Sequence, residues 1–355
     1  MKHFVRILYC IVILNIESTF TAPKGKSDFG ELAAEYGYIT EEYDVVTEDG
    51  YILRLFRIKG ERKRPILLMH GIFDSSDTWI LRGNTSLAIT LADKGYDVWV
   101  GNCRGNKYAR DHISFDPNLT DGFWDYSFHE HGYYDLPAII DNVLYFSGAD
   151  KLDAVGHSQG TTIFYVLGSA RPEYNSKINI LVASGVPRTF AARGDLQMCV
   201  INTVFPIIGE DKEELEPEII PVILDHFPTA TSVQNLYHFA QLSFRRQFAR
   251  FDYGPVINLY KYGNPVPPTY DLNNVTMKVA LFVGANDKLS TIEDVGVLKD
   301  ALPNVVRNLI MPREKMNHAD FIWGLHMHEY LFPYLFEVLD DYKNHGNTFG
   351  YILKT

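Results

Sequence analysis

Residues 151–168, KLDAVGHSQGTTIFYVLG, constrain the fold of this chain more than any other segment. The apolar residues Leu152, Ala154 and Val155 predict a short strand, and the apolar positions after Gly160 predict a helix. A strand, a sharp turn and a helix are the context in which a G-x-S-x-G pattern exposes a strained serine at the end of a sheet. The pattern therefore predicts that Ser158 is a nucleophile, with an ordinary turn and a surface serine as the alternative.

The two glycines of the pattern have a steric purpose in this prediction. A Cβ atom at Gly156 or Gly160 would crowd a strand and a helix that approach each other closely. We therefore expect the helix after Ser158 to pack directly on the neighbouring strands.

Apolar runs alternate with helical patterns along the chain, which is typical of a mostly parallel sheet covered by helices. A hairpin is predicted for residues 42–47 and 51–58, on either side of a Glu-Asp-Gly turn. Helices are predicted near residues 86–94 and 135–146. Strands are predicted for residues 65–69, 96–100, 152–155, 178–184, 277–283 and 305–310, and the first two of these are predicted to be buried.

The alternation stops over residues 186–270, where aromatic residues at helical spacing follow an acidic run at 210–218. We interpret 186–270 as a mainly helical cap inserted between two parts of one core, residues 22–185 and 271–355. The acidic run is predicted to be a solvated helix start, because carboxylates are favoured at the positive end of the helix dipole.

The N-terminus is typical of a secretory signal peptide, predicted for residues 1–21. It has a basic start, an apolar run over 7–16 and a small-residue exit. A membrane-spanning helix would need about 20 apolar residues, so an uncleaved anchor is the weaker alternative. Three N-x-S/T sequons, at Asn84, Asn118 and Asn274, are consistent with a glycoprotein that is secreted or lysosomal.

Charge and cysteine content exclude several classes of partner. The net charge of -11 argues against nucleic acid, which requires clustered Lys and Arg. Of three cysteines, Cys10 lies in the signal peptide, so Cys103 and Cys199 can form at most one disulfide. No His or Cys spacing indicates a zinc site, and we expect no metal and no cofactor.

Three residue types follow one another in the chain order of an α/β-hydrolase site, each after a predicted strand. Ser158 is the predicted nucleophile, Asp287 the acid and His318 the base. Ser158 would attack an acyl carbonyl, His318 would transfer its proton to the leaving alcohol, and Asp287 would fix the imidazole tautomer. The predicted donors to the oxyanion are the backbone N–H groups of Gln159 and Ile72.

Several neighbours compete for these roles. Asp294 is an alternative acid, and His326 and His328 are alternative bases. Two other histidines, His70 and His157, are predicted to be structural, although His70 also suits a pocket wall. Asp320 is predicted to cap a helix that begins near Phe321.

Taken together, these segments resemble the acid lipase family, the group of gastric and lysosomal acid lipases, between about residues 30 and 336. Several of the matching motifs are specific to that family rather than to the fold. They are TEDGYIL (47–53), MHGIFDSSDTWI (69–80), LADKGYDVWVGNCRGN (91–106), YDLPA (134–138), VGHSQGTT (155–162), TSVQN (231–235) and NHADFIWG (317–324).

The resemblance implies an α/β-hydrolase fold, the same triad and oxyanion donors, and triacylglycerol or cholesteryl ester substrates taken at a lipid–water interface at acidic pH. Two departures stand out: Cys103 replaces an expected serine, and the segment between Pro221 and Thr231 is shorter than the family's lid, which has a cysteine pair. The shorter segment leaves a carboxylesterase acting on short soluble esters as a second hypothesis. A non-catalytic lipid-binding protein is a third, although a binder does not require the Ser-Asp-His set.

Overall fold

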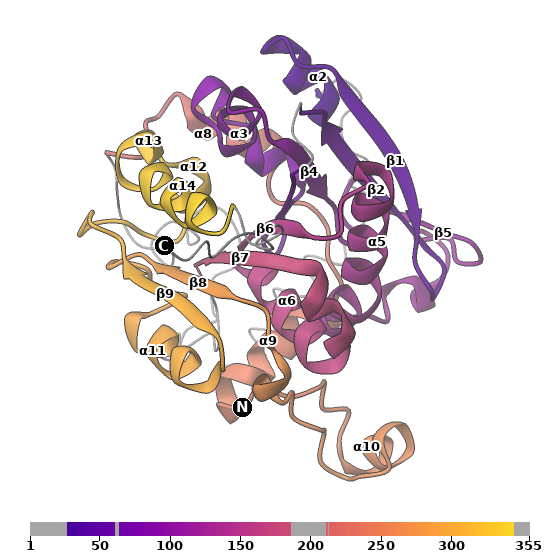
Figure 1. Cartoon of the computed structure of the whole chain (residues 1–355). Coiled ribbons are helices and arrows are strands. Elements are labelled where there is room, and N and C mark those ends of the chain that lie inside the picture. The colour runs from indigo at the N-terminus through magenta and orange to yellow at the C-terminus, as the bar shows by residue number, and fades with distance from the viewer. Residues whose placement is uncertain (1–26, 61–63, 186–210, 212, 344–355) are drawn as a thin grey trace, which may run out of the picture.

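The computed structural model describes residues 27–60, 64–185, 211 and 213–343. Within them, nine strands form one twisted sheet in the order β1-β2-β4-β3-β6-β7-β8-β9, with the short β5 paired to β2 (Figure 1). The strands are β1 (Thr40–Val46), β2 (Tyr51–Ile58), β3 (Pro65–Met69), β4 (Asp97–Gly101), β5 (Asp111–His112), β6 (Leu152–His157), β7 (Ile178–Ser184), β8 (Val279–Val283) and β9 (Val305–Ile310).

The sheet is mostly parallel, as expected. The predicted hairpin is confirmed as the antiparallel pair of β1 and β2, and β2 is also antiparallel to β4. Every pairing from β4 through β3, β6, β7 and β8 to β9 is parallel. The six predicted strands are present with ends within two residues of the expected ones. The two that were predicted to be buried, β3 and β4, are buried along their whole length.

Successive residues of a strand point to opposite faces of the sheet, and both faces are covered. In β3, Leu67 and Met69 belong to one buried apolar cluster, whereas Ile66 and Leu68 belong to the other. Outside the connection between β7 and β8, the longer helices that contribute to the first cluster are α5 (Leu136–Ser147), α6 (Gln159–Ala170) and α11 (Ile292–Ala301); those of the second are α2 (Phe29–Glu35), α3 (Leu87–Asp93), α12 (Asp320–Trp323), α13 (Met327–Tyr330) and α14 (Phe332–Asp341).

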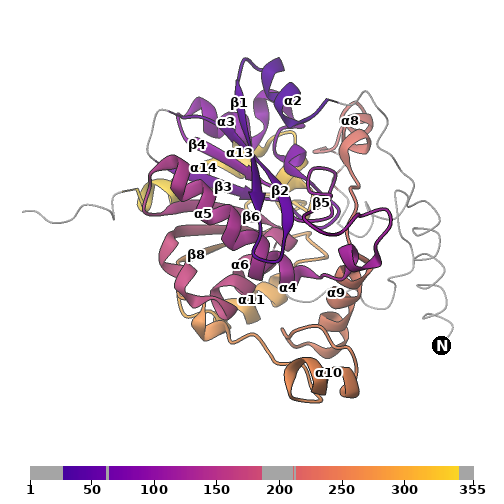
Figure 2. The ribbon, with the colours of Figure 1, turned by 90° about the vertical axis from the view of Figure 1, so that its right-hand side faces the viewer.

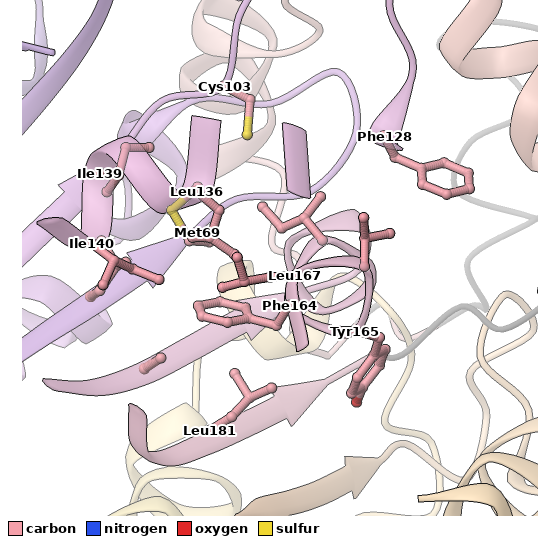
Figure 3. Packing of buried hydrophobic residues seen from close by; sticks show 14 of the residues in the cluster. Met69, Cys103, Phe128, Leu136, Ile139, Ile140, Phe164, Tyr165, Leu167 and Leu181 are labelled. Atoms are coloured by element: carbon pink, nitrogen blue, oxygen red, sulfur yellow. The ribbon is translucent and has the colours of Figure 1, made fainter. Parts of the chain in front are cut away.

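Helix α6 lies at the centre of the first cluster. Figure 3 shows Phe164 and Leu167 of α6 between Met69 of β3, Leu136 of α5 and Leu181 of β7. This packing fixes the helix that follows Ser158 against three other elements of the core.

Between β7 and β8 the described chain forms α8 (Ile219–His226), α9 (Val233–Arg245) and α10 (Pro255–Tyr262), which lie along one side of the molecule (Figure 2). The first part of the predicted cap, residues 186–210, and the predicted signal peptide lie outside the described residues. Shorter helical turns complete the described chain: η1 (Ser76–Trp79), η2 (Gly83–Thr85), η3 (Asp121–Trp124), α4 (Phe128–Glu130), η4 (His131–Asp135), η5 (Pro172–Lys177) and η6 (Leu272–Asn274).

The prediction for the acidic run was wrong for two of its residues. Asp211 and Glu214 are buried rather than solvated, and α8 begins only at Ile219. Both carboxylates pair with Arg313, at 2.8 Å and 3.4 Å, and Glu214 also accepts a hydrogen bond from the Tyr330 hydroxyl at 3.0 Å. Distant cations and donors, which a local pattern does not reveal, determine where these carboxylates lie.

Other predictions concern surface residues and cysteines. The sequon residues Asn84, Asn118 and Asn274 are all exposed. Cys103 is buried and forms no disulfide with a described residue, while Cys199 lies outside the described residues. None of the described helices is both long and apolar enough to span a membrane.

Candidate active site

Ser158 occupies a sharp turn between β6 and α6, with φ 54° and ψ −123°. A left-handed φ is unusual for a residue with a side chain, and the neighbours hold it in place. The Ser158 N–H donates to the carbonyl of Ser184 at the end of β7, at 3.1 Å. The serine therefore projects from a backbone that its two flanking elements fix.

The predicted steric reason for the flanking glycines is confirmed. A Cβ atom at Gly160 would lie 2.2 Å from the Met69 carbonyl oxygen, and one at Gly156 would lie 2.8 Å from the Gly160 carbonyl oxygen. Both obstacles are backbone atoms, so neither can rotate away.

Asp287 and His318 are joined by a hydrogen bond of 2.8 Å between His318 Nδ1 and Asp287 Oδ2, and both residues are buried. The other oxygen of Asp287 accepts from the Leu289 and Ser290 N–H groups at 2.9 Å and 2.8 Å. A carboxylate held in this way favours the His318 tautomer with the proton on Nδ1. Nε2 is then free to accept a proton.

The His318 ring lies beside the serine turn. Gly185 directly follows Ser184, the residue that accepts the Ser158 N–H, and a Cβ atom at Gly185 would be 3.0 Å from His318 Cε1. Only a glycine leaves room for the imidazole there. No hydrogen bond between the Ser158 hydroxyl and the ring is present, but the structure brings the serine turn, the imidazole and the carboxylate together.

His157 contacts the backbone of His318. Its Nε2 is 2.9 Å from the carbonyl oxygen of His318. Burial lowers the pKa of His157 well below the usual value, so the ring is neutral and its single N–H donates to that carbonyl. The structural role expected for His157 is therefore to hold the carbonyl of His318 in place.

The two predicted oxyanion donors flank Ser158. Gln159 is the first residue of α6, so its N–H has no acceptor within the helix. Ile72 follows Gly71, where a Cβ atom would be 3.2 Å from the Ser158 Cβ atom. Both amides therefore belong to segments that touch the serine.

The Gln159 side chain links the core to the cap, a role that the sequence did not reveal. Its amide nitrogen donates to His131 Nδ1 at 3.1 Å, and its carbonyl oxygen accepts from Asn235 of α9 at 2.7 Å. Asn235 is part of the TSVQN motif, which matched the family without a stated role. In the sequence, only the match of this motif to the family indicated that Asn235 has a role.

A residue of the cap, Thr229, also holds the loop that contains Ile72. Phe73 has a left-handed φ of 61°, and its carbonyl oxygen accepts from the Thr229 N–H at 2.6 Å. The Thr229 hydroxyl donates to the carbonyl of Asp74 at 2.9 Å. The short connection between α8 and α9 thus packs on the loop beside Ser158.

The competing residues make other contacts. Asp294 lies in the first turn of α11, where Thr291 donates to its carboxylate at 3.2 Å. His326 is 3.1 Å from Glu214, and His328 is half exposed beside Glu329. No contact with the serine turn is present for any of these three among the described residues.

His70 is structural rather than reactive. Its Nε2 accepts from the Cys103 N–H at 3.1 Å and its Nδ1 is 2.7 Å from the Gly71 carbonyl oxygen. Burial lowers its pKa to about 4, so the ring is neutral.

The prediction that Asp320 caps a helix was wrong. Asp320 is itself the first residue of α12, and the oxygen of the Asn317 side chain accepts from the Ala319 and Asp320 N–H groups at 2.8 Å and 3.2 Å. Asp320 instead accepts from the Asn317 N–H at 2.8 Å. The two residues brace the turn that contains His318.

The described residues contain no group of three His, Cys, Asp or Glu side chains arranged to hold a metal ion. The site contains a strained serine, an oriented imidazole and two N–H groups beside the serine. This arrangement suits nucleophilic acyl transfer.

Two family models match the sequence. A model described as a partial alpha/beta-hydrolase lipase region matches residues 29–83, and one described as the alpha/beta hydrolase fold matches residues 64–196. Among solved structures, a bacterial membrane phospholipase A superposes with a TM-score of 0.58 at 15% identity, over 97% of this chain and 100% of that one. At that identity, the likeness shows the fold alone.

Curated relatives are much closer in sequence. Lipase 1 of Drosophila melanogaster is 37% identical over 87% of this chain and 79% of its own length. Gastric triacylglycerol lipase of Rattus norvegicus is 35% identical over 85% and 89% of the two chains. Lysosomal acid lipase/cholesteryl ester hydrolase of Homo sapiens is 31% identical over 91% and 94%. The chain therefore belongs to the acid lipase family, a family of carboxylic ester hydrolases with the α/β-hydrolase fold.

Proposed function

We propose that the protein is a serine ester hydrolase that cleaves neutral lipid esters, triacylglycerols or cholesteryl esters, through an acyl-enzyme. The observation that supports this most strongly is the 2.8 Å hydrogen bond between His318 Nδ1 and Asp287, beside a serine with a left-handed φ of 54°. An imidazole oriented in this way is the activator that a serine hydroxyl requires, because the free hydroxyl is a weak nucleophile.

In the proposed reaction, the Ser158 hydroxyl attacks the ester carbonyl while His318 Nε2 accepts its proton. The Gln159 and Ile72 N–H groups stabilise the negative charge on the carbonyl oxygen. His318 then returns the proton to the leaving alcohol, which departs and leaves an acyl group on Ser158. A water molecule, deprotonated by His318, releases the acid by the same steps in reverse.

The proposed substrate class follows from the relatives. The names of two of them, a gastric triacylglycerol lipase and a lysosomal acid lipase/cholesteryl ester hydrolase, state activity on neutral lipid esters. We extend that class to this chain because the identity covers most of each sequence. The names of the same relatives support a secreted or lysosomal location. We also propose that residues 186–270 form a cap, because α8, α9 and α10 lie in this connection between β7 and β8.

Ser158→Ala tests the proposal. Loss of the nucleophile should lower turnover by about a million-fold, on a long-chain triacylglycerol emulsion and on a short soluble ester alike. Wild-type protein should also bind a fluorophosphonate probe covalently, and the variant should not. Ser176→Ala, which alters an exposed serine, is the matched control and should retain both labelling and turnover.

The outcomes separate the three hypotheses. Faster turnover of long-chain than of short-chain esters supports the lipase, whereas turnover of short soluble esters alone assigns the protein to the carboxylesterases. A folded wild-type protein that neither reacts with the probe nor turns over any ester rejects both enzymes and favours a binding protein.

A further inference from the structure

One helix of the cap presents apolar side chains to solvent. Val256, Leu259 and Tyr260 of α10, which share one face of the helix, are 81%, 56% and 91% exposed, and Val266 just beyond is 60% exposed. Both views show α10 projecting from the body of the molecule, away from the sheet (Figures 1 and 2). Contiguous exposed apolar residues of this kind mark interaction surfaces.

Helix α10 is rigidly attached to the segment before it. The side chain of Asn258 is fully buried: its amide nitrogen donates to Asp252 Oδ1 and to the Pro265 carbonyl, and its oxygen accepts from the Tyr253 N–H. The Tyr262 hydroxyl also donates to the Phe251 carbonyl at 2.9 Å. The apolar face therefore moves together with residues 251–253.

A polar pocket of about 200 Å³ lies at the base of α10. Water occupies roughly 30 Å³ per molecule in the liquid, so the pocket has room for a small oxyanion. It is lined by Ser127, His129, Glu130, Arg250, Phe251, Tyr253, Lys261 and Tyr262. The last two residues belong to α10, so the pocket and the apolar face share one helix.

The pocket has more free donors than acceptors. Arg250 Nε is buried without an acceptor among the described residues, while Nη2 of the same guanidinium donates to His129 Nε2 at 2.9 Å. Lys261 Nζ lies 4.3 Å from the centre of the Tyr253 ring, and no carboxylate of the described residues pairs with it. A buried guanidinium nitrogen without an acceptor is costly, so an anion between Arg250 and Lys261 would relieve this cost.

The titratable neighbours do not cancel these cations. Glu130 Oε2 already accepts from the Ser127 N–H and hydroxyl, at 2.7 Å and 3.1 Å. Burial raises the pKa of Glu130 and lowers the pKa of His129 well below its usual value. Two further carboxylates are near: Asp125 is exposed to solvent, and Asp252 already pairs with Arg245 and accepts from Asn258.

We propose that α10 and this pocket form a docking site for phospholipid surfaces, in which the pocket binds a lipid phosphate and the apolar face of α10 enters the acyl layer. The phosphate is the anion because Arg and Lys side chains recognise its oxygens. The lipid is its source because an apolar face of aliphatic and aromatic side chains lies directly beside the pocket. The overall charge of -11 does not attract anionic surfaces, so the contact depends on this local site.

Flotation with vesicles tests the proposal without any turnover, so its result is independent of the proposed esterase activity. Wild-type protein should float with phosphatidylcholine/phosphatidylglycerol vesicles and much less with digalactosyldiacylglycerol vesicles, which lack phosphate. Val256→Ser with Tyr260→Ser should weaken partitioning by roughly tenfold or more, because both substitutions remove apolar surface that would enter the acyl layer. Arg250→Gln should remove the preference for phospholipid over galactolipid.

Matched controls alter similarly exposed residues elsewhere. Tyr145→Ser on α5 and Val297→Ser on α11, at residues that are 80% and 50% exposed, and Arg307→Gln on β9 should leave partitioning unchanged. Equal binding to both kinds of vesicle, or equal loss in the controls, overturns the proposal. So does binding of inorganic phosphate by a protein that ignores vesicles, or an α10 variant that only converts a dimer to a monomer.

Discussion

Two buried residues near the candidate active site have pKa values that are shifted in opposite directions. Burial, together with the nearby Asp211 and Glu214 carboxylates, raises the pKa of Asp320 to about 7, whereas burial lowers the pKa of His70 to about 4. In the folded protein Asp320 therefore holds a proton that the unfolded chain has already lost above pH 4. His70, in contrast, lacks a proton that the unfolded chain binds below about pH 6.5.

Asp320→Asn should change how stability depends on pH. Between about pH 4 and 7 the folded state binds one more proton at Asp320 than the unfolded state, so this residue makes the free energy of unfolding fall as pH rises. The variant should lose that fall, while Asn retains an oxygen to accept from the Asn317 N–H. Urea unfolding at several pH values measures the difference between the two chains. Profiles that run parallel between pH 4 and 7 would contradict the assigned pKa.

Residue roles were predictable where the chemistry restricts the residue type. Ser158, Asp287 and His318 stand out because each follows a strand in the required order. The supporting residues His131, Thr229 and Asn235 did not, because their contacts join positions that are far apart in sequence. The sequence favours Asp320 as a capping residue as much as Asn317, since both residue types cap helices well. Only the folded structure shows that Asn317 accepts from the N–H groups at the start of α12.

At the scale of elements, the contact between α6 and β3 permits no side chain at Gly160. Gly160→Ala would place a Cβ atom 2.2 Å from the Met69 carbonyl oxygen. We expect the free energy of unfolding to fall by about 1–3 kcal/mol, the usual cost of overpacking. Urea denaturation measures this directly.

Gly296→Ala is the matched control for that substitution. Gly296 lies within α11, and a Cβ atom there would have nothing within 4 Å. Alanine should stabilise this helix by about 0.4–1 kcal/mol. Equal effects of the two substitutions would mean that helix propensity, rather than the contact with β3, determines the result at Gly160.

Elements differ in how well their sequence predicts them. Strands β3 and β7 have the predicted ends because apolar runs bounded by turns are sufficient to define a buried strand. Strand β9 also has the predicted ends, although none of its residues is buried. The sequence predicts the cap only as helical, since the bounds of its helices depend on contacts between residues far apart in sequence, such as that of Asn235 on α9 with Gln159. The projection of α10 has no signature in the sequence, where its apolar residues are indistinguishable from core.

At the scale of the whole molecule, ion pairs attach residues 211 and 213–216, at the start of the described part of the cap, to the core. Arg313 pairs with Asp211, Glu213 and Glu214, and Arg82 donates to the Trp323 and Glu214 carbonyls and to Glu216. Segments separated by about a hundred residues or more are held in this cluster. Because these pairs replace the expected solvated helix, they also explain why residues 213–218 do not extend α8.

Arg313→Gln should destabilise the protein by about 3 kcal/mol, because it leaves Asp211 and Glu214 buried without their cation. The shift in thermal midpoint, together with faster proteolysis near residue 211, measures the effect. Arg307→Gln removes an exposed ion pair with Glu337 and should change stability by about 0.5 kcal/mol or less. A loss at Arg313 no larger than that at Arg307 would mean that the cluster is effectively solvated.

The side chain of Gln159 reaches Asn235 on α9, while its backbone N–H is the proposed donor to the substrate oxygen. A chimaera in which a longer segment replaced the chain between Pro221 and Thr231 would therefore have to keep α9 in its present position. Grafts that preserve the hydrogen bond between Asn235 and Gln159 should remain compatible with catalysis. Grafts that shift α9 by one helical turn would break the link between the transplanted segment and the turn at Ser158.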